Sequence, residues 1–379
     1  MKRIKRSICM MLYAVLLLTC TFPVSAADSG TPYSPAAHAF DRACGGVHDA
    51  FFGLAQRLMR QNEIPAKDDF MRAEHPQFYP GTEETVHGDG WYGGFADESI
   101  IPQMWRMNAH RQPDPEGWRI RGLHGTGGYQ CALGNIFTDQ RLRLMLLSCG
   151  SDANRNGIAD ILLFISFDGV GITGQTMHKM REAVEQSLAP YGVTTVDIIA
   201  CTISATHCHN ALDTQGMYIP QILKCLPRAL MHAAPRSIEP EMEQALTAQA
   251  ASCASKAYDR MEPGTLSYYE TPPVDGAGDR LESGVRLKNW FSGFLFEGES
   301  GETTVLANLA AHPVSYSENY GGLLYADYPY FMAQALEEAG VHLVFTQSAQ
   351  ASIRTPSLNI EPDSARDREA RIRAYAVQS

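Results

Sequence analysis

The chain has 379 residues, of which 45% are hydrophobic, and it carries a formal net charge of −11 at pH 7. This length suits one large α/β domain or two smaller ones, and the hydrophobic content supports a sizeable core. The acidic balance argues against a nucleic-acid partner and offers no basic patch to an anionic membrane, because phosphate groups would be repelled overall.

The first 26 residues have the pattern of a secretory signal peptide. Four basic residues lie within positions 2–6, an apolar segment covers positions 8–18, and small residues lead up to Ala26. We therefore expect cleavage near Ala26 and export, which leaves 31 − 4 = 27 Lys and Arg against 42 Asp and Glu. Thr19 is an unusual residue before a lipidated cysteine, so lipid attachment at Cys20 is disfavoured. No later apolar run is long enough to predict a stable transmembrane anchor.

The remaining chain divides into a part that is hard to interpret and a part with clear periodicity. Residues 27–135 are rich in Gly, Pro, Trp and Tyr and predict irregular structure with short strands. Apolar runs beyond Arg141 predict buried strands at 142–147, 161–167, 196–203, 291–296, 303–309 and 343–345. Apolar stripes at helical spacing predict helices at 177–188, 219–232, 240–258 and 328–336, whereas Pro, Gly and Asp predict a loop at 262–285. Strands that alternate with helices indicate an α/β fold with mixed β-sheets flanked by helices.

Seven cysteines remain after the expected cleavage, and none forms a CxxC pair, which argues against a zinc ribbon. The odd number leaves at least one cysteine unpaired. Cys149, Cys201 and Cys208 lie in or beside apolar runs, and we expect them to be small buried hydrophobic residues.

The segment from Asp152 to Asp160 allows two interpretations. Asp152, Asn154 and Asn156 followed by Gly157 resemble the start of a calcium-binding loop, with oxygen ligands at alternate positions. The twelfth position holds Leu163 instead of glutamate. Asn156-Gly157 also suits a hairpin turn, because both residues tolerate positive φ, and we favour the hairpin.

Histidines at the ends of two predicted strands give the strongest functional signal. His207 and His209 are two residues apart, so on an extended chain they point to the same side, roughly 7 Å apart. A third imidazole from His312 could complete a site for one metal ion, and ligands favour the carboxyl ends of strands in α/β folds. The alternative is that each histidine is a hydrogen-bonded core residue. Cys208 points to the opposite face and is expected in the core.

Three sequence motifs resemble those of one enzyme family. Residues 204–209, Ser-Ala-Thr-His-Cys-His, resemble the S-A-T-H-T-H-S-G-P signature of neutral/alkaline ceramidases. Residues 308–315 with 324–329 resemble the later histidine motif of bacterial ceramidase-like proteins, and residues 345–353 are similar to their F-x-Q-G-A-x-G-D-[IV] segment. Order and spacing agree over about residues 140–360.

The resemblance implies a zinc-dependent amidase that cleaves the N-acyl bond of ceramide to give sphingosine and a fatty acid. It implies that His207 and His312 are zinc ligands and that His209 is a catalytic residue that hydrogen-bonds the substrate or the oxyanion. The family's active-site serine aligns with Arg354 and a nearby aspartate with Ser352, so these positions complete the expected site. The expected partner is an N-acyl lipid, and the oligomeric state stays open.

The departures from the family pattern leave other functions open. Arg354 replaces the serine, and the family takes a further glutamate and tyrosine ligand from downstream of Ser379. We therefore expect residues 27–379 to form a ceramidase-like domain whose C-terminal part is missing. The alternatives are a catalytically degenerate domain that binds a lipid or glycan and a metallohydrolase that acts on another ester or amide.

Asp327 either caps the following helix or holds a ligand histidine, and we favour the cap. Ser348 is a possible site hydroxyl but fits a turn better.

Overall fold

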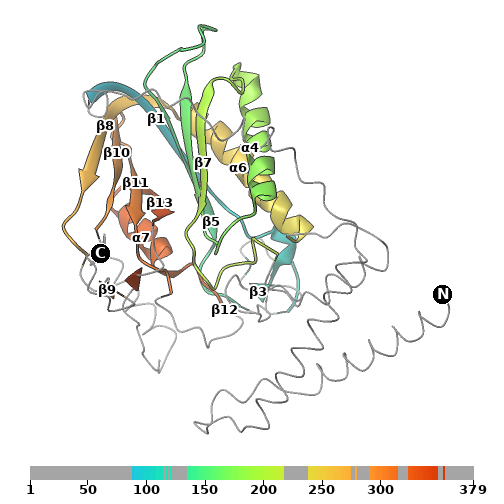
Figure 1. Cartoon of the computed structure of the whole chain (residues 1–379). Coiled ribbons are helices and arrows are strands. Elements are labelled where there is room, and N and C mark those ends of the chain that lie inside the picture. The colour runs from blue at the N-terminus through green and yellow to red at the C-terminus, as the bar shows by residue number, and fades with distance from the viewer. Residues whose placement is uncertain are drawn as a thin grey trace, which may run out of the picture. The chain divides into compact units, whose positions relative to one another are not determined.

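A large mixed β-sheet with flanking helices organises the computed structural model, which describes residues 88–108, 110–113, 117, 119–120, 135–216, 238–274, 278–279, 290–314, 323–348 and 353–354. The eight strands of this sheet follow the order β13-β11-β10-β8-β1-β5-β6-β7 (Figure 1). The expected α/β fold with mixed sheets flanked by helices is therefore confirmed. The predicted helix at 219–232 lies outside the described residues.

The strands of the large sheet are β1 (Gly88–Ser99), β5 (Arg141–Ser148), β6 (Ile161–Phe167), β7 (Ile198–Ala205), β8 (Glu262–Glu270), β10 (Ser292–Gly298), β11 (Thr303–Leu309) and β13 (Val341–Gln347). Two pairs, β6 with β7 and β11 with β13, are parallel. The other neighbours are antiparallel. Each parallel pair thus occupies one end of the sheet.

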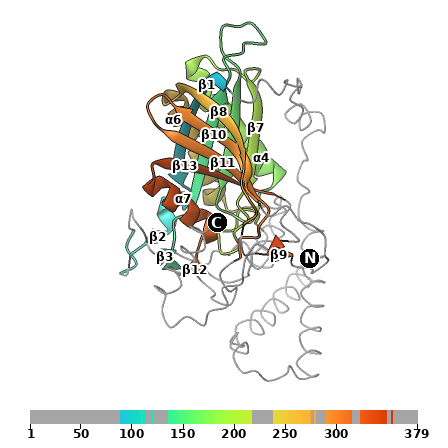
Figure 2. The same cartoon turned by 90° about the vertical axis from the view of Figure 1, so that its left-hand side faces the viewer.

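Short strands form two further sheets. A four-stranded sheet has the order β12-β4-β3-β2 and lies near the lower end of the large sheet in Figure 2. Its strands are β2 (Arg106–Met107), β3 (Arg119–Ile120), β4 (Asn135–Ile136) and β12 (Leu323–Leu324). The second small sheet pairs β9 (Gly278–Asp279) with β14 (Ile353–Arg354).

The large sheet folds back on itself. Strand β13, at one end of the sheet, packs against β5, β6 and β7 at the other end. Ser166 on β6 donates a hydrogen bond to the carbonyl of Phe345 on β13. A buried cluster fills the space between the two halves, with Met145 from β5, Phe296 from β10 and Val344 from β13. The folding back brings the two parallel pairs together.

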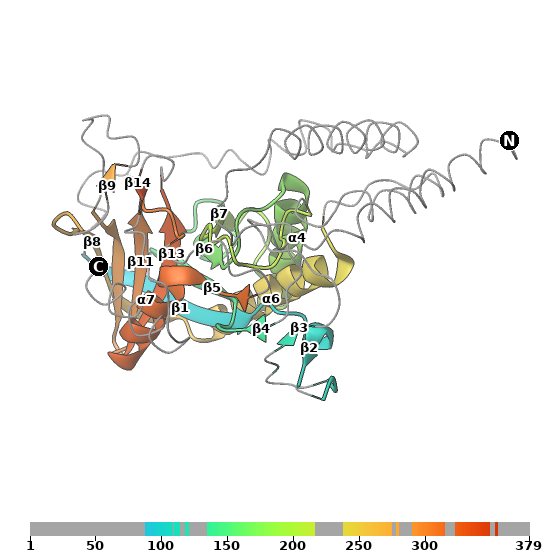
Figure 3. The ribbon, with the colours of Figure 1, turned by 90° about the horizontal axis from the view of Figure 1, so that it is seen from below.

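Helices cover the outer faces of the two halves. Helices α4 (Gly174–Leu188) and α6 (Pro240–Asp259) share a hydrophobic cluster with β5, β6 and β7, whereas α7 (Asp327–Glu338) packs on β11 and β13. Figure 3 shows α7 apart from α4 and α6. In α4, the fully buried Met180, Val184 and Leu188 repeat every four residues and make the stripe that faces the sheet. Two 3₁₀ turns, Gln103–Trp105 and Ala189–Tyr191, complete the described helices.

Strand β1 corrects the prediction of irregular structure with short strands before residue 135. It has 12 residues and pairs with both β5 and β8 near the middle of the sheet. The glycines of β1 suggested irregular structure in the sequence, but in the fold they allow neighbouring elements to pack closely. A Cβ on Gly94 would lie 2.0 Å from the carbonyl oxygen of Ala257 on α6, so only glycine permits this close approach.

Strand β8 shows that the predicted loop at 262–285 is wrong over its first third. Pro263 and Gly264 lie at its start and suggested a turn. Gly264 is needed because a Cβ there would lie 2.3 Å from the carbonyl oxygen of Glu297 on β10. Turn-forming residues therefore occupy a strand in the interior of the sheet.

The predictions for the cysteines are partly confirmed. Cys208 is fully buried and Cys201 is partly buried, but Cys149 is exposed because it lies just beyond β5, in the loop that leads to β6. These three and Cys253 are free thiols. Within the described segments, no helix is both long and apolar enough to cross a membrane.

Candidate metal centre

His207 and His209 follow the carboxyl end of β7. The parallel pairing with β6 continues beyond the strands, because the Thr206 amide donates to Phe167 at 2.9 Å and the His207 amide donates to Gly169 at 2.7 Å. His207 then adopts a left-handed backbone conformation with φ +67°. The chain therefore turns at His207 and does not continue as an extended strand. The predicted convergence of His207 and His209 is confirmed, but the extended-chain reason for it is wrong.

His312 follows the carboxyl end of β11, and its backbone is held by two side chains. The Tyr328 hydroxyl on α7 and the Gln347 amide nitrogen on β13 donate to the carbonyl oxygen of Ala311 at 2.8 and 2.9 Å. Both partners come from elements that pack on β11. The sheet end and its covering helix thus fix the main chain next to this histidine.

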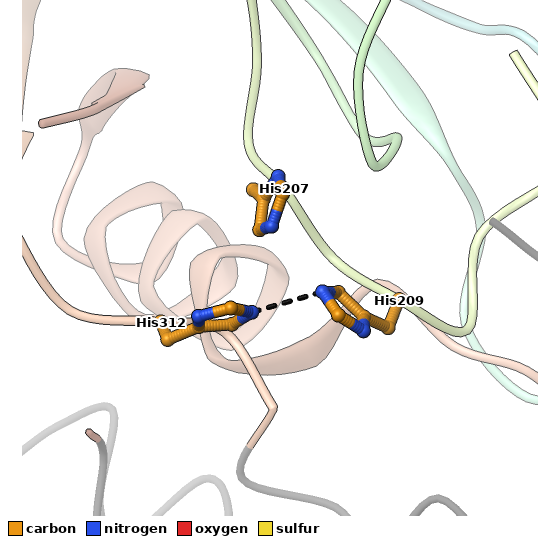
Figure 4. A group of neighbouring side chains, drawn as sticks. All are labelled: His207, His209 and His312. Atoms are coloured by element: carbon orange, nitrogen blue, oxygen red, sulfur yellow. Dashed lines mark hydrogen bonds between the residues drawn. The ribbon is translucent and has the colours of Figure 1, made fainter. Parts of the chain in front are cut away.

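The three histidines meet where the two ends of the sheet come together. Their ring centroids lie 4.8–5.0 Å apart. The Nε2 atoms of His209 and His312 are 2.9 Å apart (Figure 4). One ligand nitrogen from each residue lies within 4.8 Å of the others, and all three side chains are partly buried. This cluster could hold a metal ion.

The hydrogen bond of His207 holds its imidazole with Nδ1 directed at a backbone carbonyl. Its Nδ1 lies 2.6 Å from the carbonyl oxygen of Val170, which can only accept, so Nδ1 carries the proton and Nε2 keeps its lone pair. Metal-binding histidines commonly donate their other ring nitrogen to a carbonyl in this way. Burial lowers the pKa of His207, against the effect of this hydrogen bond, so the ring is neutral at pH 7.

The separation of the His209 and His312 nitrogens is close to that of two ligands on one transition metal, whereas the three ligand nitrogens together lie within 4.8 Å of one another. Two nitrogens bound to one zinc ion at tetrahedral angles lie about 3.3 Å apart, since each Zn–N bond is about 2.0–2.1 Å long. The observed separation of 2.9 Å between His209 and His312 needs only a few tenths of an ångström of opening. Imidazole also suits copper, iron and nickel, so the donor set fits several ions.

Cys208 lies in the core, as predicted, and does not belong to the histidine cluster. Its side chain is fully buried against Ala211 and Ala326. Burial, with Asp168 nearby, raises the pKa of the Cys208 thiol well above its usual value. A metal-binding cysteine must be a thiolate, so Cys208 remains a core residue.

A buried ion pair supports the turn that carries His207. Asp168, which follows β6, lies 3.2 Å from the guanidinium of Arg143 on β5, and both side chains are buried. Asp168 also accepts from the Arg141 amide at 3.0 Å and from the Thr206 hydroxyl at 3.4 Å. Burial raises the pKa of Asp168, whereas Arg143 opposes this effect. These bonds anchor the residue that immediately precedes His207.

The remaining predicted residues have different outcomes. Asp327 is buried at the start of α7, and its Oδ1 accepts from the Tyr328 amide at 2.7 Å. The capping prediction is wrong, because Ala326 occupies the N-cap position of α7 and no side chain caps this helix. The Ser348 amide donates to Leu309 at 3.1 Å and extends the pairing of β13 with β11. Ser352 and the side chain of Arg354 lie outside the described residues.

The groups that position the histidines have no clear signal in the sequence. Tyr328 and Gln347 lie within the recognised motifs, and their proximity to His312 depends on packing between distant segments. The Val170 carbonyl is a backbone group, so no residue type marks it. A polar side chain directly after a buried strand was the signal that could have pointed to Asp168.

Comparisons with known proteins identify similar folds. One similar structure is the neutral ceramidase from Pseudomonas aeruginosa, with a TM-score of 0.55 and 16% identity over 77% of this chain and 44% of that one. Another is a ceramidase complexed with C2, with a TM-score of 0.54, 16% identity and coverage of 77% and 43%. The chain thus spans less than half the length of these structures. No protein-family model and no curated protein sequence matches it. The chain has an α/β fold that resembles the neutral ceramidase fold.

Proposed function

We propose that this chain is an exported zinc-dependent hydrolase that cleaves the N-acyl bond of a lipid such as ceramide. The observation that carries the proposal is the cluster of His207, His209 and His312, where the two ends of the sheet pack together. The similarity to the neutral ceramidase fold supports the same conclusion. A bound zinc ion would act as a Lewis acid on the amide carbonyl and activate a water molecule for attack.

The side chains of the cluster have separate tasks in this proposal. His207 and His312 bind the metal, and the Val170 carbonyl keeps His207 in the tautomer that leaves Nε2 free. His209 binds the carbonyl oxygen of the substrate and stabilises the negative charge that develops on it. Its Nε2 lies 2.9 Å from that of His312, so it would lie beside a substrate group bound next to His312.

The activity is expected to be weak compared with that of a ceramidase, because Arg354 takes the place of the family's serine. Loss of one catalytic group commonly costs about 10²–10⁴-fold in rate without abolishing turnover. The guanidinium of Arg354 is always charged and binds carboxylates or phosphates well. The preferred substrate would therefore carry an anionic head group that ceramide lacks.

A panel of fluorescent N-acyl lipids, with and without a chelator, tests the activity. We expect slow, chelator-sensitive release of fatty acid from the wild type, with a change in head-group preference in Arg354→Ser. Cleavage that persists after complete metal removal would exclude the mechanism. Tight lipid binding with no cleavage of any amide would favour a degenerate lipid-binding domain instead.

The two possible roles of His209 can be separated in one variant. If His209 acts on the substrate, His209→Ala retains its metal and loses at least about tenfold in kcat. If His209 is instead a third ligand, the same variant loses metal together with activity. A variant with full metal and full activity would remove His209 from the site.

Mass spectrometry of the mature N-terminus tests export, and we expect a chain that begins just after Ala26 without a lipid.

A further inference from the structure

The loop between β5 and β6 gathers carboxylate and amide groups at the sheet ends opposite the histidines. Asp160 immediately precedes β6 and Asp197 immediately precedes β7. Because these strands are parallel neighbours, the two aspartates lie next to each other, and the Ile161 amide donates to the Asp197 carbonyl at 2.8 Å. The histidine cluster lies at the carboxyl ends of the same strands. The two sites are therefore distinct.

The loop has the internal hydrogen bonds of a tight cation-binding turn. Asp152 accepts from the amides of Asn156 and Gly157 at 3.1 and 2.8 Å through its two carboxylate oxygens. Asn154 Oδ1 accepts from the Asn156 amide at 3.0 Å. Gly157 has φ +89°, which permits the sharp turn at the sixth position of a calcium loop. The predicted hairpin is confirmed, but the residues with positive φ are Arg155 and Gly157 rather than Asn156 and Gly157.

Asp197 fixes the orientation of the two loop amides. Its Oδ1 accepts from the side-chain nitrogens of Asn154 and Asn156 at 2.7 and 2.8 Å. Its Oδ2 accepts from the amide and hydroxyl of Thr194, both at 2.7 Å. These bonds direct the amide oxygens of both asparagines away from Asp197. Each of these oxygens has two lone pairs and uses one for a backbone N–H, so one remains for a cation.

Asp160 supplies an independent sign of a missing ligand. Its side chain is only 4% exposed, and its Oδ2 accepts from the Ala153 amide at 3.0 Å, which places the carboxylate against the loop. Its Oδ1 is buried and has no hydrogen-bond partner among the described residues. A buried carboxylate oxygen without a partner is unfavourable unless a cation or a hydrogen-bond donor binds it. None of the described Lys, Arg or His side chains pairs with Asp152, Asp160 or Asp197.

We infer that the loop of residues 152–160 binds a calcium ion. The ligands are the side-chain oxygens of Asp152, Asn154, Asn156 and Asp160 and the carbonyl oxygen of Ile158 at the seventh position. Calcium prefers six to eight oxygen ligands of this kind, and water fills the remaining positions. The twelfth position, which holds a glutamate ligand in other calcium loops, is Leu163 of β6 in this chain. Asp160 supplies the second carboxylate ligand in its place. Two charged ligands predict a dissociation constant between about 10⁻⁶ and 10⁻³ M.

Isothermal titration of CaCl₂ into the chain, stripped of metal with EDTA and then desalted, tests the site. We expect one calcium ion per chain. Asp160→Asn should weaken binding at least about tenfold, because it removes a charged ligand but keeps the side-chain shape. Glu299→Gln is the matched control: it removes one negative charge from the exposed turn between β10 and β11 and should bind calcium as the wild type does.

A second variant covers the case in which Asp160→Asn does not fold. Asn154 is exposed, so Asn154→Ala should fold and should also weaken calcium binding at least about tenfold. Absence of one-site binding in the wild type would overturn the inference. Equal calcium affinity in the wild type and in whichever of the two loop variants folds would also overturn it.

Discussion

At the scale of single residues, His207 has both an unusual backbone conformation and a side chain fixed by a hydrogen bond. Its φ of +67° costs energy in a residue with a Cβ, and its ring is held by the Val170 carbonyl. Strain of this kind persists where the surrounding structure fixes it and is common at functional sites. The backbone at this position favours glycine or asparagine, so a histidine here fits the proposed role of its side chain as a metal ligand.

The histidine cluster makes a direct prediction about metal content. We expect His207→Ala and His312→Ala to lose most of the zinc that the wild type holds, close to one ion per chain. The control is His178→Ala, whose imidazole lies on α4 beside Glu182 and does not belong to the cluster. Elemental analysis of the purified variants decides the result, and equal metal content in all of them would remove both residues as ligands.

Asp197 makes the stability of the fold depend on pH. Burial acts to raise the pKa of Asp197, but hydrogen bonds from Thr194, Asn154 and Asn156 outweigh it and lower the pKa below its usual value. A carboxyl group whose pKa is lower in the folded state stabilises the fold above its unfolded pKa of about 3.9. That contribution disappears as the pH falls through the lower, folded pKa.

The corresponding variant is Asp197→Asn, studied with EGTA present so that calcium does not contribute. We expect a loss of roughly 1.5–3 kcal/mol in the free energy of unfolding at pH 7, as for other hydrogen bonds to charged groups. The difference from wild type should shrink as the pH falls below about 4. Denaturant unfolding at several pH values measures it. Asp259→Asn, on an exposed aspartate that accepts from Tyr191, should show little change at any pH.

At the scale of elements, the sequence predicts the regular strands and helices well. The prediction of 303–309 coincides with β11, and α6 differs from its predicted range by one residue. These elements follow hydrophobic periodicity, which is a local property. Strands β1 and β8 were not predicted, because they contain glycines that the sequence alone associates with turns. These glycines are required by close contacts with Ala257 and Glu297, which lie far away in the sequence.

Gly94 offers a test of this close approach. Gly94→Ala would place a methyl group 2.0 Å from the backbone carbonyl oxygen of Ala257, which no side-chain movement can relieve. We expect a loss of roughly 1–3 kcal/mol in the free energy of unfolding, since overpacking displaces α6 from the sheet. The exposed change Val196→Ala should alter this value by less than about 0.5 kcal/mol. A Gly94→Ala variant as stable as the wild type would show that α6 can shift freely.

The candidate site was predictable only in part. His207, His209 and His312 were recognised because each lies just beyond a predicted strand, and the structure brings all three together. The residue pattern allowed all three histidines to share one metal ion, whereas the family resemblance implied that His209 hydrogen-bonds the substrate or the oxyanion. Nothing local in the sequence shows that the Nε2 of His209 approaches that of His312. That distance depends on the folding back of the whole sheet, which no short segment encodes.

At the scale of the whole molecule, metal binding and stability should be coupled. An ion that binds only the folded state, at a free concentration of 100 times its Kd, adds about 2.7 kcal/mol to the free energy of unfolding. We expect EDTA to lower the Tm and zinc to restore it, at constant excess calcium. A His207→Ala, His312→Ala double variant should not respond to zinc. Restoration of its Tm by zinc would place the stabilising site elsewhere.

The folding back of the sheet also has a consequence for the order of folding events. His209 and His312 are 103 positions apart in the sequence and belong to opposite ends of the sheet. Contacts of such long sequence separation form late, because closing the intervening chain is entropically costly. The metal site should thus be absent from the folding transition state. Zinc should then slow unfolding in stopped-flow experiments and leave the refolding rate unchanged, so that the ion determines the lifetime of the native state and not the speed of its formation.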